Sequence, residues 1–184
     1  MTSSEEIATF AQELLAEHNR LRDQFGGVND LELDAELSSK AQAHADSLAA
    51  RQCKLENSTD ESVGENLYYL ESDDGKYTAK HIVDYWLRRS NFDHKTKPRT
   101  TNHFTQIVWK SSEKLGVGVS RAANGAVYVA AFYSPRGNVV NYLDENVLMK
   151  DAAQTDAGAG SSSDNQNDVR MNLKLFKIKI YNKF

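Results

Sequence analysis

The sequence predicts an α+β domain in which helices cover an antiparallel sheet. Apolar residues recur at helical spacing in successive segments of the first 110 residues, which indicates amphipathic helices. Two runs rich in β-branched and aromatic residues follow, separated by a segment that ends in Asn-Gly, a typical hairpin signal. Because the helices come first and the strands later, the order favours α+β over an alternating parallel arrangement.

The first two predicted helices each carry one apolar stripe. The first ends at Gly26-Gly27. Its stripe comprises Ile7, Phe10, Leu14, Leu21 and Phe25. Asp34 is placed to cap the second helix, because an aspartate before an apolar-periodic run accepts from free N–H groups. The buried stripe of this second helix comprises Leu37, Ala41, Ala45 and Leu48.

Two more helices are predicted before the strands. One covers Thr78 to Arg89, and the other covers His103 to Lys110. The inward-facing residues are Ile82, Val83 and Trp86 in the first of these, and Phe104, Ile107 and Val108 in the second. The polar segment from Glu56 to Asn66 is predicted to be a loop.

The strands are predicted at Leu115 to Arg121 and Ala126 to Tyr133, with the turn at Ala122 to Gly125. Gly116-Val117-Gly118 lies inside the first of these strands. No helix follows it, so it is not a dinucleotide-binding motif.

Composition sets the broad class. The chain has 184 residues and a formal net charge of −4, which argues against nucleic acid as the main partner. The first residues contain no apolar run long enough for a signal peptide, and Thr2 excludes the N-myristoylation pattern. Cys53 is the single cysteine, so no internal disulfide forms. These features predict a reduced, cytoplasmic protein.

The end of the chain differs from the rest. Residues 149–168 are rich in small and polar types and are predicted to be a disordered linker. Residues 169–184 contain five Lys or Arg and no acid, and are predicted to be a basic amphipathic tail. A helix and a strand fit this tail equally well. The tail is also rich in Asn, Lys, Ile, Phe and Tyr, which AT-rich codons encode, as expected if an intron were read through by an accident of gene structure.

Four motifs appear in order over the first 145 residues. They are HNRLR at His18–Arg22, GENL at Gly64–Leu67, HFTQIVWKSS at His103–Ser112, and YSPRGNV at Tyr133–Val139. Together they resemble the signatures of the CAP superfamily, the cysteine-rich secretory, antigen 5 and pathogenesis-related proteins. The resemblance implies an α-β-α sandwich, a central antiparallel sheet covered by helices, over residues 5–148.

Cysteine usage places the chain within that family. Ala131 stands where secreted members have a cysteine in the second signature. The chain is therefore similar to the cysteine-poor intracellular branch, with its Golgi-associated plant-pathogenesis-related and non-secreted venom-allergen-like proteins. This implies a cytoplasmic protein that is peripheral to membranes, as a monomer or a homodimer.

The resemblance also implies a central cavity with two His and two Glu, which in several members binds zinc. Glu65 and His103 match two of these positions, whereas Asn57 and Arg89 stand at the others. An amide oxygen is a poor zinc ligand and an arginine repels a dication, so we expect no strong zinc site. His94 is a possible substitute ligand. Alternatively, Glu65 and His103 only hold two loops together through hydrogen bonds.

The remaining histidines and the cysteine have structural interpretations. His44, His18 and His81 lie on predicted helices, where packing is commoner than metal ligation. His18 is expected to be structural within its motif. Cys53 is expected to be an inert, buried thiol.

Two functions remain open. The first is a non-enzymatic protein that binds lipid (a sterol, a fatty acid or an anionic phospholipid) or a protein partner. Its lipid contacts would be Tyr68, Tyr69 and Tyr77, whose rings combine apolar bodies with polar tips, although Tyr68 and Tyr69 suit a core equally well. The alternative is a metal-dependent hydrolase that uses the partial His/Glu cavity.

Overall fold

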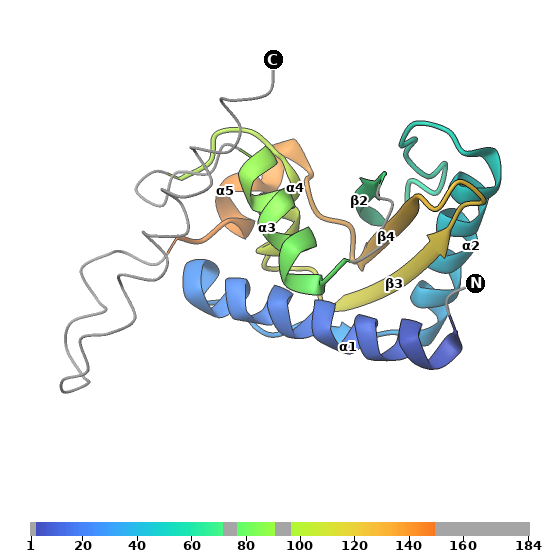
Figure 1. Ribbon diagram of the computed structural model, residues 1–184. Coiled ribbons are helices and arrows are strands. Elements are labelled where there is room, and N and C mark those ends of the chain that lie inside the picture. The colour runs from blue at the N-terminus through green and yellow to red at the C-terminus, as the bar shows by residue number, and fades with distance from the viewer. Residues whose placement is uncertain (1–2, 72–76, 91–96, 150–184) are drawn as a thin grey trace, which may run out of the picture. The chain divides into compact units, whose positions relative to one another are not determined.

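The computed structural model describes residues 3–71, 77–90 and 97–149 (Figure 1). The predicted tail, His94 and all of the predicted linker except Met149 lie outside the described residues. The elements are α1 (Ser4–Leu21), the π-helical turn η1 (Arg22–Gly26), β1 (Glu32–Leu33), α2 (Ala35–Arg51), β2 (Gly64–Leu70), α3 (Ala79–Arg89), α4 (His103–Ile107), β3 (Lys114–Arg121), β4 (Val127–Ser134), the 3-10 turn η2 (Val140–Tyr142) and α5 (Leu143–Asn146).

The sheet has the strand order β1-β3-β4-β2. β3 and β4 form the predicted antiparallel hairpin, and β2 pairs antiparallel with the other edge of β4, with Gly64 opposite Tyr133. The prediction of a loop up to Asn66 was wrong in its last residues, because β2 begins at Gly64. The first residues of β2 are polar, so the sequence pattern does not indicate a strand there. They form a strand because their backbone pairs with β4, from Gly64 opposite Tyr133 to Leu70 opposite Val127.

Helices cover both faces of the sheet, which confirms the predicted α-β-α sandwich (Figure 1). Alternate residues of β4 point to opposite faces. Val129, Ala131 and Tyr133 join the core formed with α1, α3 and α4, whereas Ala130 and Phe132 join the core formed with α2. We call these the α1 face and the α2 face.

α2 approaches the sheet closely because β3 carries two glycines. A Cβ atom at Gly116 would lie 2.3 Å from the carbonyl carbon of Leu37, and one at Gly118 would lie 2.3 Å from the backbone nitrogen of Gln42. The Gln42 side chain then bonds the strand backbone, accepting from Val119 N–H at 2.9 Å and donating to Val119 O at 2.8 Å. The absence of side chains at these glycines thus sets the distance between helix and sheet.

Side-chain caps fix where the helices begin. Asp34 accepts from Leu37 N–H at 2.8 Å, as predicted, and Thr78 and Asn102 cap α3 and α4 in the same way. α4 ends at Ile107, so its predicted extension to Lys110 was wrong. Within the part of the chain that the structure describes, no helix has the length and apolar character needed to cross a membrane.

Candidate functional site

The HNRLR motif forms a buried polar network that links α1 to the sheet. His18 is fully buried, and its Nδ1–H donates to Leu14 O at 2.7 Å. In the neutral imidazole Nε2 is then an acceptor, and it accepts a hydrogen bond from the Tyr133 hydroxyl at 2.7 Å. Burial lowers the pKa of His18 to about 4, so the ring is neutral at pH 7. This bears out the structural role predicted for His18.

The network continues to β2 and α4. The Asn66 amide donates to the Tyr133 hydroxyl oxygen and to His103 O, both at 3.1 Å. Asn66 therefore connects β4 with the first residue of α4. The asparagine of the GENL motif positions α4, a role that its sequence pattern alone does not reveal.

Arg22 ties the end of α1 to the chain around α4. Its side chain is fully buried, and burial lowers its pKa to about 10, so it stays charged at neutral pH. The guanidinium donates to the backbone carbonyls of Asn29, Ile107, Trp109 and Ser112, at 2.8–3.0 Å. The planar group with five donors is suited to collecting several carbonyls, which explains an arginine here.

Glu65 lies on the α2 face, near the start of β2. Its side chain is 11% exposed, and Oε2 accepts from Ser58 N–H at 2.9 Å. The same oxygen lies 3.6 Å from Nε2 of His44, on α2. Burial raises the pKa of Glu65, while the Ser58 bond and the nearby His44 oppose that rise. The histidine beside Glu65 is thus His44, a pairing that none of the four motifs predicts.

His103 belongs to the α1 face. Its ring stacks on Trp86 of α3, with ring centroids 6.5 Å apart and an interplanar angle of 11°. Burial lowers the pKa of His103, and the positive charge of Arg89 lowers it further. Glu65 and His103 therefore have different partners: Ser58 and His44 contact the carboxylate, and Trp86 stacks on the imidazole.

A cavity of about 300 Å³ adjoins Glu65. Its lining includes Asn57, Asp60 and Arg136 but not His103. On one wall, Gly64 and Gly137 leave room for the Gln106 side chain, whose Oε1 accepts from Gly137 N–H at 3.1 Å. The cavity is lined almost entirely by polar groups, namely carboxylates, amides and a guanidinium, whereas most small-ligand pockets are mainly apolar.

The residues present do not fit the zinc site that the CAP resemblance implies. Asn57 and Arg89 replace two ligand types, and Arg89 is close enough to His103 to lower its pKa. Within residues 3–71, 77–90 and 97–149, no three His, Cys, Asp or Glu side chains converge to hold a metal ion. We therefore assign no chemistry to a bound metal here.

The three tyrosines predicted to contact lipid do not share one surface. Tyr68 is 2% exposed, and its ring packs edge-on against Tyr85 at 5.1 Å, so it belongs to the core of the α1 face. Tyr69 is half-buried on the α2 face beside Tyr128. Tyr77 is half-buried on the α1 face and lines a separate groove beside α1.

The remaining candidates are simpler. His81 is exposed on α3. Cys53 is a free thiol that is only half-buried, so the expectation of a buried thiol was wrong in its extent.

The sandwich and the positions of the four motifs define a domain of the CAP class. A family model described as "CAP: Cysteine-rich secretory protein family" matches residues 15–133. The chain belongs to this family.

Curated relatives cover most of the described chain. Golgi-associated plant pathogenesis-related protein 1 of Homo sapiens is 38% identical over 147 residues, which span 76% of this chain and 92% of that protein. Pathogenesis-related leaf protein 4 of Solanum lycopersicum is 36% identical over 70% of this chain and 79% of its own length.

Solved structures confirm the fold. NaASP2 with Zn²⁺ has a TM-score of 0.56 at 24% identity and covers 75% of this chain and 83% of its own. BmVAL-1 has a TM-score of 0.54 at 18% identity, covering 75% of this chain and 80% of its own. At these identities the likeness concerns the fold and not the site.

Proposed function

We propose that this protein is a non-enzymatic CAP-domain protein that binds lipid, or a protein partner, on the cytoplasmic side of membranes. The lipid is a sterol, a fatty acid or an anionic phospholipid. The observation that carries the non-enzymatic part is that Glu65 and His103 have different partners: Ser58 and His44 contact the carboxylate, and Trp86 stacks on the imidazole.

A metal-dependent hydrolase would need a metal, an activated water and a base in one place. Here the Glu65 carboxylate faces His44, and the His103 ring lies against Trp86 beside Arg89. The positive charge of Arg89 works against any cation near His103, because like charges repel most strongly in a partly buried site. These contacts favour binding over catalysis.

Two observations support the membrane part of the proposal. The human relative is named as Golgi-associated, and the similarity covers 92% of its length. The sequence of residues 169–184, outside the described part, combines five Lys or Arg with apolar residues and no acid. Such a segment is attracted to anionic lipid, at roughly 1 kcal/mol for each basic residue near the surface.

Vesicle flotation tests the proposal. The full chain is mixed with vesicles of phosphatidylserine, of a sterol-containing mixture, or of neutral lipid, and the floating fraction is measured. We expect flotation with the anionic or the sterol-containing vesicles. Salt should weaken flotation with the anionic vesicles, because screening shortens the range of the attraction. Flotation with none of these vesicles would contradict lipid binding.

A further inference from the structure

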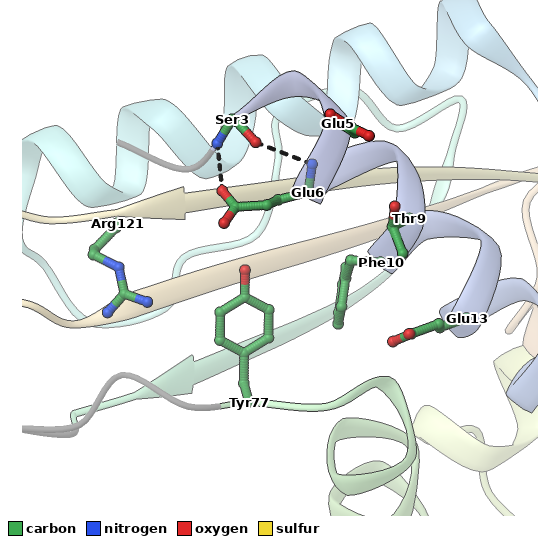
Figure 2. Close-up of a pocket in the computed structure, with 8 residues that line it drawn as sticks. All are labelled: Ser3, Glu5, Glu6, Thr9, Phe10, Glu13, Tyr77 and Arg121. Carbon is green, nitrogen blue, oxygen red and sulfur yellow. Dashed lines mark hydrogen bonds between the residues drawn. The ribbon is translucent and has the colours of Figure 1, made fainter.

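A second cavity lies on the α1 face, away from Glu65. Figure 2 shows this groove between the first turns of α1, Tyr77 ahead of α3, and Arg121 at the end of β3. Its volume is about 580 Å³, within the range usual for small-ligand sites. None of its lining residues lines the cavity beside Glu65. It is therefore an independent candidate for a ligand.

Two aromatic rings form part of the groove. Phe10 and Tyr77 meet edge to face, with ring centroids 5.1 Å apart and an interplanar angle of 77°. Phe10 is 6% exposed and gives a fixed base, while Tyr77 is half-buried and its hydroxyl points into the groove (Figure 2). A cation beside such rings is attracted by their π faces, and quaternary ammonium groups are recognised in this way.

The charged side chains of the groove are mostly acidic, and its one basic side chain lies at one end. Figure 2 shows Arg121 on one side of the Tyr77 ring and Glu13 beyond Phe10 on the other. Glu6 is held in the capping box, where its Oε2 accepts from Ser3 N–H at 2.7 Å. With Glu5 also in the lining, the groove has three carboxylates and one guanidinium. This surplus of negative charge disfavours a purely anionic ligand. Arg121 already donates from Nη1 to Gly125 O at 3.0 Å, and the remaining donors of its guanidinium can meet one anion.

We propose that this groove binds choline phosphate, with its quaternary ammonium against Phe10 and Tyr77 toward Glu13 and its phosphate toward Arg121. The ammonium gains from the aromatic rings and the carboxylates, and the phosphate gains from the guanidinium. This inference goes beyond the proposed function, because choline phosphate heads zwitterionic lipids rather than the sterols, fatty acids or anionic phospholipids named there. Choline phosphate occurs as a lipid headgroup and in soluble esters, and the chemistry of the groove serves both.

The test is calorimetric titration of the full chain with phosphocholine, choline and inorganic phosphate. We expect phosphocholine to bind more tightly than choline, and phosphate alone not to bind. Tyr77→Leu should weaken phosphocholine about five-fold, as loss of a partly exposed cation–π contact implies. Tyr142→Leu is the matched control, because Tyr142 is 54% exposed and lies outside the groove lining.

Two charge variants separate the ends of the ligand. Glu13→Gln should weaken choline and phosphocholine alike, whereas Arg121→Gln should weaken phosphocholine and leave choline unchanged. Glu32→Gln, on the exposed edge strand β1, should change neither. Circular dichroism of each variant shows that the fold is kept.

Phosphatidylcholine vesicles identify the source of the ligand. Flotation that free phosphocholine competes away indicates the lipid headgroup, and binding of phosphocholine without flotation indicates a soluble ester; both support the groove. Absence of saturable phosphocholine binding, or equal binding by Tyr77→Leu and Tyr142→Leu, would overturn it. If the protein still floated with anionic or sterol-containing vesicles in that case, lipid binding would stand and only this site would fail.

Discussion

Protonation of His18 should make the domain unstable in mild acid. The pKa of His18 is about 4 in the folded protein, against its ordinary value of 6.5, mainly because burial disfavours the charged ring. Below pH 6.5 the unfolded chain therefore binds a proton that the folded protein does not bind until about pH 4. Stability is unaffected above this window and falls as the pH drops through it.

The loss of unfolding free energy follows from the difference between the folded and unfolded pKa of His18. A difference of about 2.5 pKa units corresponds to roughly 3 kcal/mol, at 1.36 kcal/mol per unit. That is a large part of the roughly 5–15 kcal/mol that a typical domain has. Arg22, one turn further along the chain, adds to the effect because its charge opposes a second cation.

The assay is urea unfolding at a series of pH values between 7.5 and 4. Wild type should lose roughly 3 kcal/mol of unfolding free energy from His18 across this range. In His18→Gln the amide still can bond Tyr133, and the part of the slope due to His18 should vanish. His81→Gln, exposed on α3, is the control and should keep the wild-type slope. An unchanged slope in His18→Gln would refute the reasoning. The raised pKa of Glu65 acts with the opposite sign and is common to all three proteins.

Three further substitutions test the packing. Arg22→Met leaves four backbone carbonyls without this donor, and we expect a loss of at least about 4 kcal/mol in chemical unfolding, given roughly 1–3 kcal/mol per unsatisfied group; a loss below about 1 kcal/mol would show that the carbonyls find other partners. Gly118→Ala places a Cβ against the backbone of α2, so a loss near the upper end of about 1–3 kcal/mol is expected in the melting curve, and unaltered melting would mean that α2 moves freely. Asn66→Leu should cost about 1–3 kcal/mol and speed amide exchange at the start of α4, because the Tyr133 and His103 contacts are lost; wild-type exchange there would contradict its positioning role.

Local patterns in the sequence were sufficient for much of the fold. The cap at Asp34, the stripe of α2 and the β3–β4 hairpin depend on neighbours along the chain, and each was predicted correctly. β2 was missed because it becomes a strand only by pairing with β4, which follows more than 50 residues later. The two-residue strand β1 depends on β3 in the same way.

The site was less accessible to sequence reasoning. Motif matching found Glu65 and His103, but whether two motif residues share a cavity depends on which face of the sheet each meets. Counting along β2 with its partner register would have placed Glu65 with Leu67 and Phe132, on the α2 face, and so beside α2. His44 is then the residue of α2 that faces Glu65. The spacing of the two residues along the chain does not predict this contact, because it depends on how α2 packs on the sheet.

Zinc affinity tests the central claim most directly, namely that Glu65 and His103 do not form a shared metal site. Purified protein is titrated with zinc against a competing chromophoric chelator, comparing wild type with Glu65→Gln and His103→Ala. The account predicts that wild type does not bind zinc at submicromolar concentration, and that neither substitution changes the titration. Submicromolar binding that is lost in both variants would show that the two residues share one ion, and would contradict the account.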